Sequence, residues 1–435
     1  MKYRIFGIFF ACAGLFYWIG CGAEHFSKVS IEGKKGTWHL VVDGEPLYIK
    51  GAGCGLGWGR EGEDYLAMAR EMGANSVRTW GTDQGTRDYL DRARRLGLKV
   101  ACGIWINWAD PAKGYSYLGD SDYKRSKRKE ALEYVRRFKN HPSVLLWNVG
   151  NEALFFTKDE KEKVALAQFL EELIREIKKE DPHHPTLYAA AGTQTLPYLK
   201  KYVPSLDIVG MNIYGSIRSA QSAWEAQDFG KPYIITEYGP YLPIDSSKDP
   251  NGKSVELDDA SKAMLYRNMA RQIAEFSGCN LGGYVFHLGE TTQDSLTWWN
   301  LNHGRYKKGS YWAMREMYTR KTPPPDIPRI RSLRLSPDRA LRPGETIEAE
   351  VVLREDRPGW IYSYLLSTSE EGTLRYYVND PLKAEIIQQD GPRILLRAPS
   401  AEGTYRLYCF VTNGKENMAA INKTIRVVCN PAREQ

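Results

Sequence analysis

The stretch Ser143-Val-Leu-Leu-Trp-Asn-Val-Gly-Asn151-Glu152 is the strongest indication of how this chain folds, because it joins a buried strand to an acidic residue. Residues 144–149 are a short run of β-branched, aromatic and leucine residues close to Pro142 and Gly150, which is typical of a strand buried on both faces. A second run of this kind, at 233–236, leads directly into Glu237. A carboxylate at the end of such a strand is held rigidly at the rim of a parallel sheet, where α/β folds keep their chemistry.

A regular alternation of strand-like and helix-like segments extends from residue 47 to about residue 317. Eight such strands over roughly 270 residues match a (β/α)₈ TIM barrel, which typically has about 250 residues. A doubly wound open sheet is the alternative, although it ordinarily has fewer strands. No strand is followed by a Gly-rich phosphate-binding motif, so a nucleotide site has no support. The strands are predicted at 47–51, 76–79, 99–104, 144–149, 186–191, 208–213, 233–236 and 283–286.

Changes in composition divide the rest of the chain. Residues 22–46 form an N-terminal segment with a hairpin that turns at Asp43-Gly44, and we expect this hairpin to close the barrel floor. The catalytic barrel is predicted at 47–321, and a stiff proline-rich linker follows at 322–328. Residues 329–430 alternate apolar and polar side chains with period two, which predicts a small all-β immunoglobulin-like sandwich.

Residues 1–21 are predicted to be an export signal rather than part of the fold. A basic start is followed by an apolar run at 5–19, and Gly20-Cys21 resembles the lipobox of bacterial lipoproteins, with Trp18 where that motif usually has Leu. We expect lipidation of Cys21 and a membrane-anchored protein of the periplasm or cell surface. Ordinary cleavage near Ala23 and an uncleaved anchor helix are the alternatives, and all three versions export the chain.

The aromatic content is more informative than the charge, although many of the aromatic residues are expected to be buried. The net charge of +7 is mild and no nucleic-acid motif is present, so we expect no nucleic acid as partner. The content of 12 Trp and 27 Tyr exceeds what a core requires, and aromatic faces stack well on sugar rings. No metal or cofactor motif appears. The cysteines beyond the export signal are expected to be buried free thiols, with a Cys409–Cys429 pair as the alternative.

Two carboxylates at strand ends suit the hydrolysis of a glycosidic bond, which needs one carboxylic acid and one carboxylate. The run from His141 to Glu152 resembles the acid/base signature of glycoside hydrolase family 2 and, more broadly, of the retaining glycosidases of clan A. The resemblance covers the barrel, about 60% of the chain. Its other matches are Leu47-Tyr-Ile-Lys-Gly51, Asn75-Ser-Val-Arg78, Asn212-Ile-Tyr214 and Thr236-Glu237-Tyr-Gly.

The resemblance implies a role for each of these residues. Glu152 corresponds to the general acid/base, with a raised pKa, and Glu237 to the ionised nucleophile. Arg78 would hold the nucleophile ionised, and Tyr214 would donate a hydrogen bond to it. Asn151 would bind the sugar 2-hydroxyl, and Asn212 belongs to the supporting matches. Retention requires the two carboxyl groups to lie only ~5–5.5 Å apart.

Several residues after the strand ends are candidates for sugar contact or, alternatively, for loop packing. They are Trp80, Trp105, Asn107, Trp108, Trp298 and Trp299. His287 is either a substrate contact or a core residue, whereas His183 and His184 are expected to be structural.

The sequence therefore predicts a retaining β-glycoside hydrolase that acts on an extracellular polysaccharide or oligosaccharide with β linkages. A transglycosidase of the glucanosyltransferase kind would use the same covalent intermediate. A non-catalytic carbohydrate-binding lipoprotein would explain the aromatic residues but not the set of Glu152, Glu237, Arg78 and Tyr214.

Overall fold

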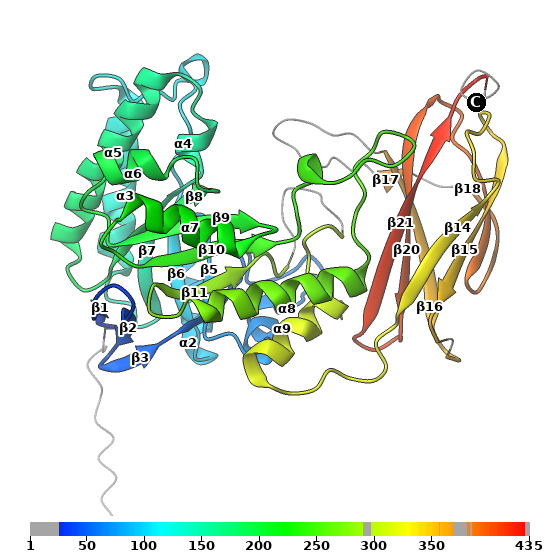
Figure 1. Cartoon of the computed structure of the whole chain (residues 1–435), viewed down its shortest axis with the longest axis horizontal. Helices are drawn as coiled ribbons and strands as arrows, with labels where there is room; N and C mark the ends of the chain where they lie inside the picture. The colour runs from blue at the N-terminus through cyan, green and yellow to red at the C-terminus, as the bar shows by residue number, and fades with distance from the viewer. Residues whose placement is uncertain (1–25, 290–296, 356, 369–380, 383–384, 431–435) are drawn as a thin grey trace, which may run out of the picture.

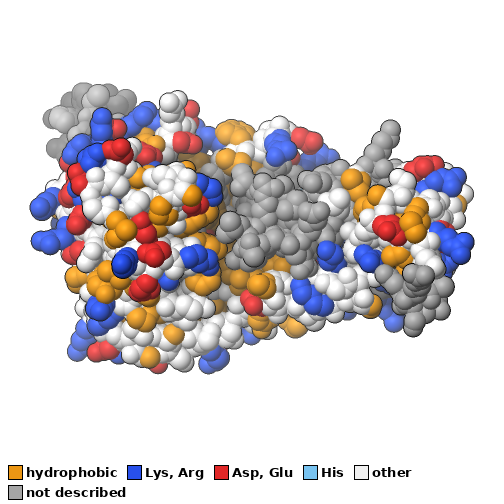
Figure 2. Space-filling model, turned by 90° about the horizontal axis from the view of Figure 1, so that it is seen from above, with side chains coloured by type: hydrophobic (Ala, Val, Ile, Leu, Met, Phe, Trp, Pro, Cys, Tyr) orange, Lys and Arg blue, Asp and Glu red, His pale blue; other side chains and the backbone are white. Residues whose placement is uncertain are grey.

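The computed structural model describes residues 26–289, 297–355, 357–368, 381–382 and 385–430 (Figure 1). The predicted export signal at 1–21, with the lipidation site Cys21, lies outside the described residues. A barrel and an all-β domain lie side by side along the long axis of the molecule. On the face seen in Figure 2, basic and acidic side chains are interspersed over the described surface of both domains.

Eight parallel strands close into a barrel in the order β10-β11-β4-β5-β6-β7-β8-β9. This confirms the predicted fold class and excludes the open sheet. Residue 47 belongs to the preceding hairpin, so the first barrel strand begins two residues later than predicted, whereas the last begins earlier, at residue 280. The strands are β4 (Ile49–Gly53), β5 (Ser76–Arg78), β6 (Lys99–Ile104), β7 (Val144–Asn151), β8 (Thr186–Ala191), β9 (Ile208–Tyr214), β10 (Tyr233–Gly239) and β11 (Asn280–Val285).

Amphipathic helices cover the outside of the barrel. In the longest of them, α5, Leu166, Leu170, Leu173 and Ile177 recur at helical spacing and are buried against the sheet. Gly73 ends α1 in the left-handed conformation and donates its N–H to the last turn, as glycine allows. The helices are α1 (Tyr65–Met72), α2 (Thr86–Arg95), α3 (Asp122–Phe138), α4 (Ala153–Phe156), α5 (Glu160–Glu180), α6 (Leu196–Tyr202), α7 (Ile217–Gln227), α8 (Asp259–Glu275) and α9 (Gly309–Thr319), with 3₁₀ turns at Pro111–Lys113 and Pro243–Asp245.

A three-stranded antiparallel sheet closes the amino-terminal end of the barrel. It consists of β1 (Val29–Glu32), β2 (His39–Val42) and β3 (Glu45–Leu47). Asp43 and Gly44 have φ of 54° and 90°, which fits the tight hairpin turn that this dipeptide predicts. Leu40 and Val42 pack against side chains from inside the barrel, such as Leu145 and Ile234. The sheet therefore closes the end of the barrel opposite the carboxyl ends of the strands.

The C-terminal domain has two four-stranded sheets around one core, which agrees with the predicted sandwich. Ile347, Ala349 and Val351 face Leu407 and Val411 within it, because alternate residues of a strand point to the same side. One sheet has the order β14 (Ile330–Ser336), β15 (Thr346–Leu353), β19 (Arg393–Arg397) and β18 (Glu385–Asp390). The other has the order β17 (Pro381–Leu382), β16 (Ile361–Thr368), β20 (Gly403–Thr412) and β21 (Met418–Val427).

The sandwich is docked on the side of the barrel to which β9 and β10 point (Figure 1). The ring N–H of Trp312 in α9 donates to Asn417 at 2.8 Å. The His303 ring stacks on Phe410, with 4.9 Å between the ring centres. His303 belongs to a short ribbon of β12 (Asn302–His303) and β13 (Tyr306–Lys307). The contact between the domains thus combines stacked rings with buried hydrogen bonds.

The cysteines among the described residues are all free, so Cys409 and Cys429 do not pair. Cys409 points into the sandwich core from β20, whereas Cys429 follows the end of β21 and is exposed. The expectation of burial holds for Cys54, Cys102 and Cys409, but it is wrong for Cys429, and Cys279 is half-buried. Within the described part of the chain, no helix is long and apolar enough to cross a membrane.

Candidate active site

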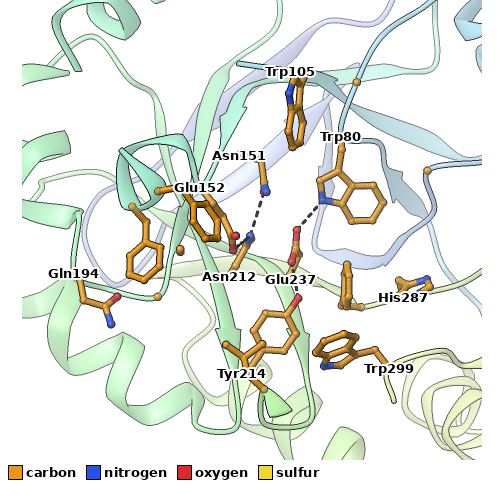
Figure 3. A pocket seen from close by; sticks show the side chains of 18 of the residues that line it. Trp80, Trp105, Asn151, Glu152, Gln194, Asn212, Tyr214, Glu237, His287 and Trp299 are labelled. Carbon is orange, nitrogen blue, oxygen red and sulfur yellow. Dashed lines mark hydrogen bonds between the residues drawn. The ribbon is translucent and has the colours of Figure 1, made fainter. Parts of the chain in front are cut away.

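A cavity of about 620 Å³ opens at the carboxyl ends of the barrel strands (Figure 3). Its walls include both predicted catalytic residues, Glu152 and Glu237, together with Asn151, Asn212 and Tyr214. These side chains come from the ends of β7, β9 and β10. Parallel strands end at one rim of a barrel, so residues distant in sequence converge there.

Three donors hold the Glu237 carboxylate. The Arg78 guanidinium and the Trp80 ring N–H each donate to Oε1 at 2.7 Å, and the Tyr214 hydroxyl donates to Oε2 at 2.6 Å. The Arg78 side chain is fully buried, so its ion pair with Glu237 is little weakened by solvent. Burial and the charge of Glu237 raise the pKa of Tyr214 well above its usual value, so this hydroxyl stays a donor. The pattern suits an ionised carboxylate in a fixed orientation.

Glu152 has a different environment. It follows β7 directly and adopts a left-handed backbone conformation with φ of 56°, at the turn into α4. Its Oε1 accepts one hydrogen bond from the Asn212 amide, at 2.7 Å. Burial, with the negative charge of Glu237 as the second cause, raises the pKa of Glu152 to about 7. The two carboxyl groups therefore differ as an acid and a nucleophile must differ.

A chain of hydrogen bonds connects the two glutamates. The side-chain oxygen Oδ1 of Asn151 accepts from Arg78 Nη2 at 2.7 Å and from the side-chain amide of Asn212 at 3.1 Å. Thr236 fixes the other end of Asn212 by donating its hydroxyl to Oδ1 at 2.7 Å. Because the Asn151 oxygen is used in this way, its NH₂ group is the part left to meet a ligand.

The remaining predicted residues divide into those on the cavity wall and those behind it. Trp80, Trp105, His287 and Trp299 line the cavity, and Trp80 in addition bonds Glu237. His287 is almost fully buried, and burial lowers its pKa to about 4, so it lines the wall as a neutral ring.

Asn107, Trp108 and Trp298 do not line the cavity. Asn107 accepts a hydrogen bond from the Trp105 ring N–H at 2.6 Å, so it stands behind that ring. Trp108 packs against the barrel core and Phe156. Trp298 is buried beside the cavity, and its ring N–H donates to the Tyr241 carbonyl at 2.9 Å. Although Trp298 is next to Trp299 in the sequence, only Trp299 of the two lines the cavity. His184 pairs with Asp181 at 2.8 Å where α5 leads into β8, and both side chains are buried, which agrees with a structural role.

Some wall residues were not predicted. Phe155 and Phe156 of α4, the helix that directly follows Glu152, line the cavity, and so does Gln194, which is labelled in Figure 3. The signal was available for the two phenylalanines, because residues that directly follow a catalytic strand lie at the same rim. Asp83 lies between β5 and α2, and Asp245 ends the 3₁₀ turn between β10 and α8; in these connections no local pattern predicts which side chains reach the cavity.

Residues 52–242 match the family model described as "Glycosyl hydrolases family 2, TIM barrel domain". This barrel is similar to the barrels of glycosyl hydrolase family 2. The resemblance seen in the sequence, to this family and to clan A, is thereby confirmed for the barrel. The family 2 model ends before the last barrel strand, so β11 and the sandwich lie beyond it.

Relatives of this family 2-type barrel include the β-glucuronidase of Paenibacillus borealis, which is 26% identical over 334 residues, 68% of this chain and 51% of that protein. A β-galactosidase of Thermoanaerobacter pseudethanolicus is 27% identical over 185 residues, 38% of this chain and 24% of its own. The crystal structure of a Bacteroides uniformis β-glucuronidase has a TM-score of 0.51 at 15% identity, covering 92% of this chain and 48% of that one, which supports the fold. The chain thus spans about half or less of the length of these proteins.

Proposed function

We propose that this protein is a retaining β-glycoside hydrolase, with Glu237 as nucleophile and Glu152 as general acid/base. The observation that carries the proposal is the contrast between these two glutamates on one cavity: three donors hold Glu237, whereas Glu152 is buried with a pKa of about 7. The proposal is further supported by the family 2-type barrel.

In the first step, a Glu237 oxygen attacks the anomeric carbon and forms a glycosyl ester, while the bond to the leaving oxygen breaks. Glu152 gives its proton to that oxygen, so the leaving group departs as a neutral alcohol. Arg78, Trp80 and Tyr214 orient the attacking carboxylate, and the NH₂ group of Asn151 is placed to bind a sugar hydroxyl.

In the second step, formation of the ester removes the negative charge of Glu237. Since that charge helps to raise the pKa of Glu152, its loss lowers the pKa and favours the ionised form. Water then attacks the anomeric carbon while Glu152 accepts a proton from it, and the bond between the anomeric carbon and Glu237 breaks, which releases Glu237 as a carboxylate. The stereochemistry is inverted twice and so retained overall.

Covalent trapping tests this proposal directly. A 2-deoxy-2-fluoro-β-glycosyl fluoride should add one glycosyl mass to the peptide that contains Glu237, and Glu237→Gln should abolish both labelling and turnover. Glu256→Gln is the matched control, because Glu256 is also a buried glutamate but does not line the cavity. Labelling of another residue, or full turnover by Glu237→Gln, would contradict the assignment.

The pH dependence tests the role of Glu152. The acid must be protonated in the free enzyme, so kcat/KM should fall about tenfold per pH unit above a pKa of about 7. An initial-rate profile from about pH 4 to pH 9 measures this limb. A rate that stays constant up to the alkaline end would contradict Glu152 as the acid.

The proposal extends to the substrate and to the acceptor of the glycosyl group. We propose a β-linked extracellular polysaccharide or oligosaccharide as substrate, with water as the acceptor. Adding an acceptor sugar and analysing the products separates hydrolysis from transglycosylation, which would yield longer products.

We also propose export and anchoring through a lipid on Cys21. Cys21→Ala should then release the protein from the membrane fraction of an expressing bacterium.

A further inference from the structure

We infer that the cavity takes an uncharged hexopyranoside and rejects β-glucuronides. This inference rests on the proposed function and narrows it to a substrate class. It departs from the names of several relatives, which are β-glucuronidases. It follows from the charges around the cavity.

Acidic side chains line the described walls of the cavity, and basic side chains do not. Four carboxyl groups line it, from Asp83, Glu152, Glu237 and Asp245, and the described lining residues include no Lys or Arg. The first and the last of these are exposed, so their charge is at the mouth, whereas the two glutamates lie deeper.

The Arg78 guanidinium is near the cavity, but its N–H groups already donate hydrogen bonds within the protein. It donates to Glu237, Asn151, Asn148 and the Thr236 carbonyl oxygen, and its side chain has no exposed surface. Lys158 lies outside the wall, with its ammonium 5.8 Å from the centre of the Phe155 ring, and does not line the cavity. Neither cation is placed to pair with a carboxylate inside the cavity.

A uronic acid would bring a second carboxylate next to the ionised Glu237 in a partly desolvated space. A buried charge without a partner is costly, and like charges at short range repel. The same walls suit an uncharged sugar. Hydroxyl groups can donate to Asp83, Asp245 and Gln194, while the rings of Trp80 and Trp299 can pack against the C–H faces of the sugar.

Matched aryl glycosides test the inference. We expect the best of the 4-nitrophenyl β-glucoside, β-galactoside and β-mannoside to exceed the β-glucuronide by about 100-fold or more in kcat/KM. A glucuronide that is cleaved as well as the neutral sugars, or better, would overturn the inference and leave the hydrolase proposal intact. If no glycoside is cleaved, the hydrolase proposal fails.

Binding measurements then decide the inference separately. Calorimetry with non-cleavable aryl β-thioglycosides should detect the neutral thioglucoside and not the thioglucuronide, and the reverse result would overturn the inference.

Charge variants test the electrostatic reason. Asp83→Asn and Asp245→Asn should each reduce the preference for neutral sugar several-fold, because each removes a negative charge from the wall. Lys158→Met is the control and should leave the preference unchanged, since Lys158 stands outside the cavity. A preference that both Asn variants leave untouched, or that Lys158→Met abolishes, would contradict the electrostatic reason.

Discussion

Two clusters of buried charge lie at either end of the segment that joins β10 to α8, and they use similar residues for opposite purposes. The catalytic cluster consists of Arg78, Glu152, Asn212, Tyr214 and Glu237. It has two carboxyl groups and one guanidinium, and it opens on a cavity.

The interface cluster consists of Glu256, Asp259, Lys262 and Lys308, between the barrel and the sandwich. Lys262 pairs with Glu256, and Lys308 with Asp259 at 2.9 Å. The sandwich completes the set, since Asn422 donates to Glu256 at 2.6 Å and the Ala420 N–H donates to Asp259 at 2.7 Å.

The two clusters differ in the ratio of acidic to basic side chains. In the interface cluster two acids meet two bases. Although burial alone would raise the pKa of Glu256, the Lys262 and Lys308 ammonium groups lower it overall, so this carboxylate stays ionised. In the catalytic cluster the second acid has no base of its own, and its pKa rises to about 7. A balanced buried cluster holds domains together, whereas an unbalanced one keeps a proton ready for transfer.

The largest effect should come from the unbalanced acid. Glu152→Ala removes the proton donor, so kcat/KM for alkyl glycosides should fall by about 10²–10⁴, the usual contribution of general acid catalysis. Activated aryl glycosides need less protonation and should keep more of their rate in the first step. Azide should restore turnover and give a β-glycosyl azide, which can be identified by NMR; an α product would contradict retention.

The balanced cluster should affect stability instead. Glu256→Gln leaves the Lys262 and Lys308 ammonium groups buried with one carboxylate fewer, which should cost about 3–5 kcal/mol in the free energy of unfolding. Urea denaturation measures the loss, and kcat/KM of the folded protein should change less than tenfold. A destabilisation below about 1 kcal/mol would mean that the cluster is not needed to hold the interface.

The contributions of Glu152 and Glu256 to the free energy of unfolding should change with pH in opposite directions. The folded pKa of Glu152 is raised, so the contribution of Glu152 to stability is lost as pH rises from about 4.5 to about 7. Glu152→Gln lacks this loss and should gain on the order of 3 kcal/mol relative to wild type between these limits. The folded pKa of Glu256 is lowered, so its contribution is present above the unfolded pKa and lost as pH falls through the folded pKa. Urea denaturation of Glu152→Gln at about pH 4.5 and 8, and of Glu256→Gln at about pH 3 and 8, checks the signs, and shifts of the same sign would remove the contrast.

The smallest effect should come from two tryptophans on the same rim. Trp80→Phe removes one of the three donors to Glu237, so kcat should fall about 10–100-fold, as expected for a hydrogen bond to a charged group. Trp298→Phe removes a bond to a backbone carbonyl outside the cavity and should change kcat less than about threefold. Equal losses in the two variants would show that Trp80 acts through packing rather than through Glu237.

The architecture could be predicted because short-range sequence patterns indicate its strands and helices. Apolar runs at 144–149 and 233–236 indicate buried strands by their composition alone, and the alternation of strands and helices indicates a barrel. Since parallel strands end at one rim, the positions of Glu152 and Glu237 after these runs predict that they meet. Arg78, Asn151 and Tyr214 could be placed for the same reason.

Loops and domain contacts could not be predicted in this way. Nothing local distinguishes Trp299, which lines the cavity, from Trp298, which turns away, or indicates that Asn107 stands behind Trp105. Neither do the alternating strands of the sandwich indicate that Asn422 completes a charge cluster on the barrel. Periodicity encodes the direction in which a side chain leaves its own strand or helix, but the partner it meets depends on how distant segments pack, and that emerges only when the whole chain has folded.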